Sequence, residues 1–521
     1  MGLLARSAVA AVSGLAVYSG FPPHSSLWLL FLGLIGLFLG LHGATPRSGA
    51  VVGLVFGLAF MVPLLRWLTV LGPDAWLALS ALCALFYALF GWAAALTSRL
   101  AVPVAWAGAC WVGMEMLRAN IPFGGFPWGR IAFATADSEL VGLNRWVGVP
   151  ATSGLIVLAA AATAWGIVKL RSRSATVPAG LAVASPIALF AVAALLPVGL
   201  AGPGSSLLVA AVQGDVPGTG AESLGQRHEV TTNHAEATIA YARAIDAGDE
   251  DRADVVLWPE NSTDIDPFET PDVYATIDEA VKAVGVPTLV GVIVDGPEER
   301  QARNVGLVWD PATGPSAEDD WYVKRHLVPF GEYIPLREQL APMIARLDQI
   351  ARDMVPGDEA GVLELGPVTV GTMMCFDVAY DDTIADNVRS GAEVMVVQTN
   401  NATYYGTDQP EQQWGIEQVR AVETGRDLAV ASVNGISGFV SAGGTVLERT
   451  NSRDQQVLTS TMTTATGVTW GIRLGAGLET GLSLVALGAV LVALVLRRRE
   501  RGNGSDDPAP TGERSDLEPV P

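Results

Sequence analysis

The chain has few cysteines and few charged residues for its length of 521 residues. Its three cysteines show no paired spacing, which excludes a disulfide framework, and they carry no information about the redox compartment. Only 16% of the residues are charged, and acidic residues outnumber basic ones by 53 to 32. The net charge of −21 argues against nucleic acid as a partner, because phosphate binding relies on Lys and Arg.

Apolar residues are unevenly distributed along the chain. They make up 50% of it and give a mean hydropathy of +0.36, yet they concentrate at the two ends, whereas charge collects between about residues 205 and 470. Such a split is typical of a membrane protein with one water-soluble domain. We therefore predict a membrane domain at 1–202, a soluble domain at 203–470, a transmembrane helix at 471–498 and a disordered tail at 499–521.

Apolar segments predict a helical membrane domain of about eight spans, seven before residue 202 and one after the soluble domain. The first two are shorter than the roughly 20 residues that a span needs. The first lacks the strong basic start and clear cleavage site of a signal peptide, so we predict a retained helix. The segments lie near Leu3–Tyr18, Leu27–Leu41, Val51–Leu71, Trp76–Leu96, Ala101–Met116, Ala151–Leu170, Ala179–Leu200 and Leu474–Leu496.

The positions of Lys and Arg predict the orientation in the membrane. The loops at 20–26 and 72–75 contain neither residue, so we assign them to the outer side. The N- and C-termini are then cytoplasmic, the domain at 203–470 is extracytoplasmic, and the chain is a multi-pass protein of the cell (plasma or inner) membrane. The basic residues that this orientation leaves in the cytoplasm are Arg6, Arg47, Arg99, Lys169, Arg171, Arg173 and the run from Arg497 to Arg501.

In the soluble part, short runs rich in Val, Leu and Ile alternate with helical patterns, which predicts an α/β domain with a largely buried sheet. The expected strands are Leu207–Gln213, Val255–Trp258, Thr288–Val294, Asn304–Trp309, Val368–Met374, Val394–Gln398 and Leu428–Val433. The expected helices are Gln226–Ala247, Val273–Val284, Thr383–Ser390 and Gln412–Arg426.

Three residues carry the candidate chemistry, and two of them, Glu260 and Cys375, fall just after predicted strands. Cys375 follows a β-branched, apolar run, and a thiol at a strand end is held rigidly within reach of a substrate. Glu260 follows Trp258 and Pro259, which favour a partly desolvated carboxylate with the raised pKa of a general base. Lys324 can donate to the oxyanion of a tetrahedral intermediate. These residues together predict acyl transfer at a membrane.

Other interpretations of these residues remain open at this point. Taken singly, a Cys is more often a core residue, and a Glu or Lys more often lies at the surface. Among the five histidines, only His326 is an alternative base, and Glu332 can either orient Lys324 or shuttle a proton. The particular contexts Trp-Pro-Glu-Asn and Lys-Arg-His-Leu-Val-Pro-Phe-Gly-Glu favour the catalytic interpretation.

A Gly- and Pro-rich aromatic loop follows the fifth apolar segment. Phe126 and Trp128 in it suit either an interfacial anchor or a lipid-facing wall of the active site. Glu115 and Arg118 precede it and, being three residues apart, can pair on one helix face.

Glu260, Lys324 and Cys375, in this order and spacing, resemble the Glu–Lys–Cys triad of the nitrilase (carbon–nitrogen hydrolase) superfamily, whose fold is an α-β-β-α sandwich. The membrane segments narrow the resemblance to the apolipoprotein N-acyltransferase family. It covers nearly the whole chain, and the Gly-Phe-Pro-Trp loop distinguishes this family from soluble nitrilases. The motifs are Gly125-Phe-Pro-Trp128, Val212-Gln-Gly-Asp-Val-Pro217, Trp258-Pro-Glu260, Lys324–Pro335 and Arg420-Ala-Val-Glu423.

Some positions depart from the family pattern. Asp377 stands where many members have Glu, and Trp414 where His is common. Tyr404 and Tyr405 replace the usual Trp-Phe. We assign supporting roles to Glu332 and Asp377, and the expected lipid or substrate contacts are Phe126, Trp128, Trp258, Tyr404 and Tyr405.

The resemblance implies a ping-pong reaction without metal or organic cofactor. Cys375 takes an acyl chain from a membrane phospholipid as a thioester, and the α-amine of a diacylglyceryl-cysteine on an apolipoprotein then accepts it. The alternatives are a membrane-bound amidase or nitrilase acting on a small amide, and a transporter or receptor with an inactive outer domain. The full helical domain argues against the first, and the intact triad argues against the second.

Overall fold

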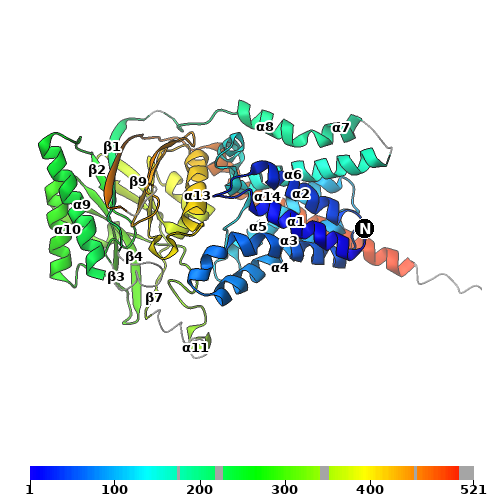
Figure 1. Cartoon of the computed structure of the whole chain (residues 1–521), viewed down its shortest axis with the longest axis horizontal. Coiled ribbons are helices and arrows are strands. Elements are labelled where there is room, and N and C mark those ends of the chain that lie inside the picture. Colours follow the sequence, from blue (N-terminus) through cyan, green and yellow to red (C-terminus); the bar gives the residue numbers. More distant parts are fainter. Residues whose placement is uncertain are drawn as a thin grey trace, which may run out of the picture.

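The computed structural model describes residues 1–172, 177–202, 204–216, 227–263, 265–340, 351–450 and 454–503. Three predictions fall on residues outside this part of the chain: Arg173 in a cytoplasmic loop, Pro217 at the end of the Val212–Pro217 motif, and the disordered tail from residue 504 onward. Figure 1 shows the apolar helices gathered at one end of the molecule and the α/β domain at the other. The chain enters the α/β domain after α8 and returns to the helices through α14.

All eight predicted apolar segments form helices, and the seventh is a bent pair. Glycines let these helices pack closely, since a Cβ on Gly53 would lie 2.0 Å from the carbonyl oxygen of Tyr87, and one on Gly91 2.2 Å from that of Gly49. The helices are α1 (Leu3–Tyr18), α2 (Leu27–Leu41), α3 (Pro46–Leu64), α4 (Pro73–Thr97), α5 (Pro103–Asn120), α6 (Gly142–Arg171), α7 (Val177–Val183), α8 (Ser185–Leu195) and α14 (Trp470–Asn503).

By length and composition, four of the described helices can cross a membrane, namely α3, α4, α6 (extended back to Glu139) and α14. The pair α7 and α8, bent by 60°, makes a fifth if it counts as one span. Helices α1 and α2 are apolar but shorter. The helical membrane domain is therefore confirmed as a class, while the count of about eight spans stays a prediction.

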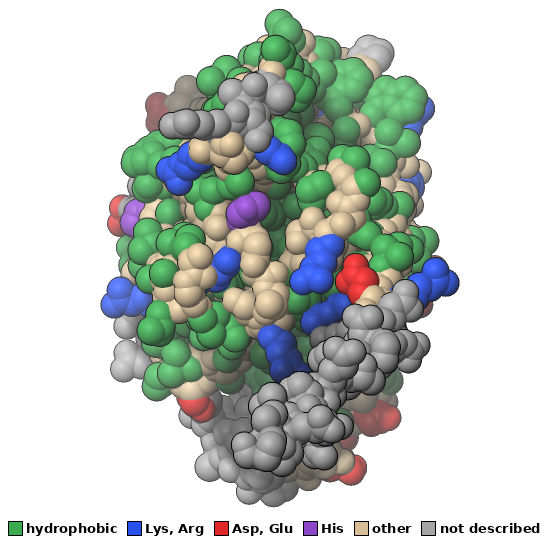
Figure 2. All heavy atoms as spheres, turned by 90° about the vertical axis from the view of Figure 1, so that its right-hand side faces the viewer, with side chains coloured by type: hydrophobic (Ala, Val, Ile, Leu, Met, Phe, Trp, Pro, Cys, Tyr) green, Lys and Arg blue, Asp and Glu red, His purple; other side chains and the backbone are tan. Residues whose placement is uncertain are grey.

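Basic side chains gather at the end of the helices that lies farthest from the α/β domain. Figure 2 looks onto this end and shows Lys and Arg with few acidic side chains between apolar flanks. Exposed Arg47, Arg99, Lys169 and Arg171 lie near the ends of α3, α4 and α6. This distribution is the one that the positive-inside rule associates with a cytoplasmic face.

Two sheets form the α/β domain. The first has eight strands: β14 (Gln456–Thr463), β1 (Ser206–Gln213), β2 (Val255–Leu257), β3 (Thr288–Asp295), β4 (Gln301–Asp310) and β5 (Gly314–Pro315) in this order, with β6 (Tyr322–Val323) and β7 (Asp353–Met354) also on β4. The second has six: β13 (Val446–Arg449), β12 (Gly438–Val440), β11 (Leu428–Ser432), β10 (Val394–Thr399), β9 (Val368–Met374) and β8 (Val362–Leu365). Strands β1, β2 and β3 are mutually parallel, as are β9, β10 and β11.

The sheets pack face to face through buried aliphatic residues such as Val209, Leu257 and Val396. Helices α9 (Arg227–Ala247) and α10 (Pro271–Val284) cover the outer face of the first sheet. Helices α12 (Asp381–Arg389) and α13 (Gln409–Thr424) cover that of the second, so the predicted α-β-β-α sandwich is confirmed. Every residue of α13 except Glu411 is buried, because the helix lies between the second sheet and the membrane helices.

Candidate active site

The three predicted catalytic residues lie at the ends of strands from both sheets. Glu260 follows β2, Lys324 follows β6 directly, and Cys375 follows β9. Among the contacts that join the sheets here, the backbone N–H of Asn400 donates to Glu260 Oε2 at 3.0 Å, and Gln398 Nε2 donates to the carbonyl of Trp258 at 2.8 Å. The strand ends that the sequence predicts separately therefore meet at one edge of the sandwich.

Cys375 occupies a sharp turn between β9 and the short 3-10 helix η8 (Cys375–Ala379). Its φ of +46° is uncommon for a residue with a side chain and marks a position that the surroundings hold in place. Asp377 provides that support: its carboxylate accepts from the backbone N–H of Met374 at 3.1 Å, from Tyr322 Oη at 2.6 Å and from the backbone N–H of His326 at 2.8 Å. Asp377 thus ties the thiol's turn to the segment that carries Lys324.

Lys324 lies between two carboxylates. Its Nζ donates to Glu260 Oε1 and to Glu332 Oε1, both at 2.9 Å, and Lys324 and Glu260 are at most 2% exposed. Asn304, on β4, donates to Glu260 at 2.7 Å and to Glu332 at 3.3 Å. The backbone N–H of Val328 donates to the other oxygen of Glu332 at 2.8 Å. Lys324 Nζ is thus held between Glu260 and Glu332, and the role of Glu332, as an orienting group or as a proton shuttle, stays a prediction.

The pKa values follow from burial and from these charges. Burial raises the pKa of the Cys375 thiol to about 12, and the Glu260 carboxylate adds to this while Lys324 opposes it. Burial also raises the pKa of Glu260 against the lowering effect of Lys324. Burial lowers the pKa of Lys324, but Glu260 and Glu332 outweigh it and hold that pKa well above its usual value. The resting site thus contains a neutral thiol beside a lysine ammonium, so attack requires a base.

An aromatic wall joins this site to the membrane helices. Phe126 and Trp128 stack on Phe376, the residue after the thiol, with ring centroids 5.7 and 6.3 Å apart. Trp128 Nε1 donates to Gln412 on α13 at 2.8 Å. Tyr404 meets Trp67 edge-on at 5.1 Å, and Trp67 in turn contacts Trp128.

Glu115 and Arg118 hold the aromatic loop in place rather than pairing with each other. Arg118 Nη1 donates to the carbonyls of Phe126, at 2.8 Å, and of Trp128. Glu115 Oε1 accepts from the backbone N–H of Ile131 at 3.0 Å. Both side chains are 1% exposed. The three-residue spacing suggested that the two side chains could pair on one helix face. Both instead bind backbone groups at 126–131, which are among the polar groups around them in this buried position.

Two predicted contacts have different surroundings. Trp258 is fully buried in the core beneath α9, where its Nε1 donates to Thr238 Oγ1 at 2.9 Å. Such a side chain has no surface for a lipid, so its expected contact role gives way to a structural one. Tyr405 is 38% exposed at the edge of the site region, next to Tyr404. Among the described residues, no group of three or more His, Cys, Asp or Glu is arranged to hold a metal ion.

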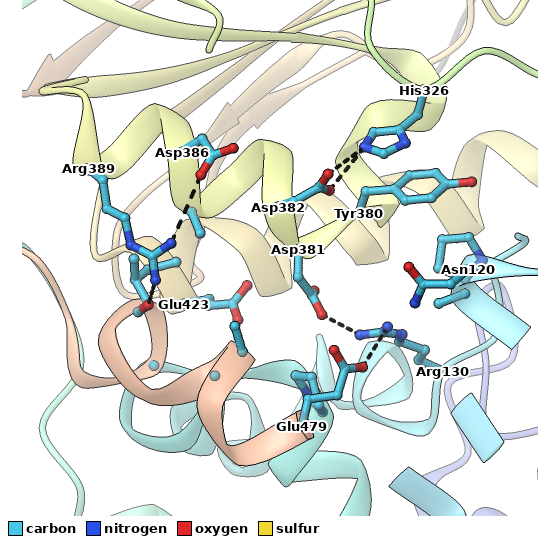
Figure 3. Close-up of a pocket in the computed structure, with 18 of the residues that line it drawn as sticks. Asn120, Arg130, His326, Tyr380, Asp381, Asp382, Asp386, Arg389, Glu423 and Glu479 are labelled. Carbon is cyan, nitrogen blue, oxygen red and sulfur yellow. Dashed lines mark hydrogen bonds and ion pairs between the residues drawn. The ribbon is translucent and has the colours of Figure 1, made fainter. Parts of the chain in front are cut away.

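A cavity of about 350 Å³ lies between the α/β domain and the helices α5, α6 and α14, and neither Cys375 nor Lys324 lines it (Figure 3). Figure 3 shows Arg130 pointing toward Asp381 on α12 and Glu479 on α14, with which it forms ion pairs. Arg420 on α13 reaches Asp381 from the other side at 2.8 Å and donates to the carbonyl of Val378 at 2.8 Å. Burial raises the pKa of Asp381, but the two guanidinium groups outweigh it and lower that pKa. This network fixes the turn after Cys375 to α14.

Comparison with known proteins gives two family matches along the chain. Residues 13–162 match the model of the apolipoprotein N-acyltransferase N-terminal domain, and residues 208–471 match that of carbon-nitrogen hydrolase. An apolipoprotein N-acyltransferase from Mycolicibacterium smegmatis is 34% identical over 508 residues, covering 92% of this chain and 84% of that protein. One from Nitrosomonas europaea is 28% identical over 509 residues, covering 93% and 97%. Among solved structures, an amidase from Nesterenkonia sp. is 19% identical with a TM-score of 0.36, covering 54% of this chain and 98% of that one.

Proposed function

This chain belongs to the apolipoprotein N-acyltransferase family, and from that premise we propose the residues and steps by which it acts. It is an acyltransferase of lipoprotein maturation, and its acceptor is a lipoprotein amine. The relatives described above are acyltransferases, and they give no better support to the alternative of a membrane-bound amidase. The observation that carries the proposal is the stacking of Phe126 and Trp128, from the membrane helices, on Phe376 beside the thiol. A small amide needs no such junction between membrane and active site.

In the first half-reaction, Cys375 Sγ attacks the ester carbonyl of a membrane phospholipid. Glu260 takes the thiol proton as the new carbon–sulfur bond forms, and Lys324 stabilises the oxyanion. The carbon–oxygen bond then breaks, the proton passes from Glu260 to the leaving oxygen, and a lysophospholipid departs. Because burial raises the pKa of the resting thiol, the attack needs Glu260 to accept its proton.

In the second half-reaction, the α-amine of a diacylglyceryl-cysteine at an apolipoprotein N-terminus attacks the thioester. Glu260 removes a proton from the amine and returns it to the departing sulfur, so the amide forms and the thiol is restored. Water must be kept from the thioester, or the enzyme would act as a phospholipase. The buried Lys324–Glu260 pair and the aromatic wall support this exclusion.

The proposal is tested by measuring lysophospholipid release with and without a diacylated lipopeptide. We expect sustained release only when the lipopeptide is present, with one N-acyl chain gained per lipid cleaved. Release at an undiminished rate without an acceptor would instead indicate a phospholipase. Conversion of small amides without any lipid release would support the amidase alternative.

We further propose that the site lies on the extracytoplasmic side of the membrane. A reporter that is active only outside the cytoplasm should be active when fused after Asp310 and inactive after Arg501. The reason is that exposed basic residues gather at the opposite end of the helices. Reporter activity in the reverse pattern would overturn this orientation.

The aromatic wall is predicted to shape the entry of the acyl chain. Replacing both Phe126 and Trp128 with alanine removes the two ring stacks on Phe376 and the stack between the two rings, each contributing about 0.5–1.5 kcal/mol, and should slow acyl transfer about tenfold. The matched control is Phe123→Ala, which changes a 47% exposed ring in the same loop and should leave the rate unchanged. Membrane insertion and the unfolding midpoint are measured for both variants. Unchanged transfer by the double variant would leave these rings only an anchoring role.

A further inference from the structure

One face of α13 carries a row of polar side chains that reaches the reacting sulfur. Gln409, Gln413 and Glu417 are spaced four residues apart, so they follow one another along the helix, and each is at most 3% exposed. Gln413 Oε1 accepts from Cys375 Sγ at 3.7 Å and from Gln409 Nε2 at 2.9 Å. Gln413 Nε2 donates to Glu417 Oε1 at 2.9 Å and to Thr399 Oγ1 at 3.0 Å. We call Gln409, Gln413 and Glu417 the amide ladder.

In this arrangement the sulfur faces a carbonyl oxygen, which accepts from a thiol but repels a thiolate. The carbonyl oxygen and the NH2 group of a Gln side chain are similar in size and can exchange places by rotation. The amide ladder therefore has a second arrangement, in which the donor and acceptor of each amide are interchanged. Gln413 then points N–H groups toward Cys375 and Gln409, and its carbonyl oxygen toward Glu417. Gln409 Oε1, which is buried without a partner in the first arrangement, gains a donor in the second when Gln409 turns as well.

The second arrangement requires a proton on Glu417, since two bare oxygens would otherwise face each other. Burial raises the pKa of Glu417 to about 8, against the lowering effects of Gln413 and of Arg449 on β13. Arg449 itself pairs with Glu411 at 2.8 Å. The protonated form is therefore available at neutral pH, and the described charges that act on the sulfur are Glu260, Lys324 and Glu332.

We propose that Gln413 is a further catalytic residue, in contact with the reacting sulfur, and that Glu417 is a positioning residue that selects which end of the amide faces it. With Glu417 protonated, Gln413 N–H groups stabilise the developing thiolate, both when the thiol attacks and when the amine expels it. With Glu417 ionised, the Gln413 carbonyl holds the thiol. This deepens the proposed function and rests on it only for Cys375 as the nucleophile.

The test measures how fast iodoacetamide alkylates Cys375 in the full-length, detergent-purified protein, by mass spectrometry of the Cys375 peptide. Rates are compared at about pH 6.5 and about pH 9, on either side of the Glu417 pKa of about 8. Below this pKa the amide ladder of the wild type donates to the sulfur and stabilises the thiolate. Above it, the ladder accepts from the sulfur and stabilises the thiol. The alkylation rate of the wild type should therefore rise less with pH than it would for an isolated thiol, whose thiolate fraction grows with pH. Glu417→Gln offers an N–H to Gln413 at every pH. It should match the wild type at the lower pH and react about tenfold faster at the higher one.

Two further variants separate this role from a structural one. Gln413→Leu cannot donate to a thiolate and should react about tenfold more slowly than the wild type at about pH 6.5. Adding Glu417→Gln to it should have no further effect, because Glu417 acts through Gln413. The control Glu448→Gln removes the same charge from an exposed position on β13 and should leave the profile unchanged. Unfolding midpoints confirm that the compared proteins are folded.

If the wild type and Glu417→Gln were alkylated at equal rates at both pH values, the proposed role of the amide ladder would be wrong. A Glu417→Gln effect that persists in the Gln413→Leu background would overturn it as well. A second measurement, the mass of the acyl adduct on Cys375 after incubation with phospholipid, separates failure of the proposed function from failure of the amide ladder. A shifted alkylation profile without any adduct would retain the ladder and reject the acyl transfer, whereas a normal adduct with an unshifted profile would do the reverse.

Discussion

Replacing Cys375 with alanine is expected to abolish the covalent acyl adduct and all turnover. Incubated with phospholipid alone, the wild-type protein should gain the mass of one acyl chain, which neutral hydroxylamine removes. The variant should keep its unmodified mass. The reason is that Cys375, unlike Cys83 and Cys110, is a partly exposed residue, and it lies on a turn held by Asp377 beside the charges of Glu260 and Lys324.

The other two cysteines provide a matched control. Cys83 on α4 and Cys110 on α5 are 1% and 5% exposed among the membrane helices. Replacing either with alanine should leave both the adduct and the turnover intact. If the Cys375→Ala variant N-acylated a diacylated lipopeptide at the native rate, both the nucleophile and the two-step mechanism would be wrong.

Local sequence context explains why three candidate residues could be predicted. Glu260 and Cys375 follow runs that read as strands, and strand ends are where sites collect in such sheets, whereas the motif around Lys324 matches the triad that the chain resembles. In the structure these residues come from two different sheets, and Lys324 Nζ lies 2.9 Å from Glu260 Oε1. Asn304 and Gln413 were not predicted, because their roles depend on strand register and on helix packing. Neither residue has a sequence context that distinguishes it from ordinary polar residues.

The missed strands have a similar explanation. β13 reads Val-Leu-Glu-Arg and is mostly exposed, and β14 is rich in Thr and Ser, so neither gives the apolar run by which the inner strands were recognised. Helix α13 shows the opposite effect. Its Gln and Glu residues are typical of a helix at the surface of a soluble domain, yet it is buried because a second layer of helices covers it. That cover comes from the membrane domain, whose docking no local pattern specifies.

Glu260→Gln and Lys324→Met should each slow formation of the acyl adduct by about 10² or more. The first removes the base and the second removes the cation that stabilises the oxyanion. Glu260→Gln leaves Lys324 paired with Glu332 at 2.9 Å, so its unfolding midpoint should change little. Lys324→Met leaves the buried Glu260 and the partly buried Glu332 without the cation that they share, and only Asn304 still donates to both, at a cost of about 3–5 kcal/mol. Adduct formation is therefore measured per folded protein.

The two variants should have opposite effects on the thiol itself, which separates loss of chemistry from loss of structure. Glu260 raises the pKa of Cys375 and Lys324 lowers it. Glu260→Gln should therefore speed alkylation by iodoacetamide, because more thiolate is present, although acylation slows. Lys324→Met should slow both reactions. Slower alkylation in both variants would point to a damaged site and would contradict the assignment of base and oxyanion stabiliser, since removing the Glu260 charge from an intact site can only favour the thiolate.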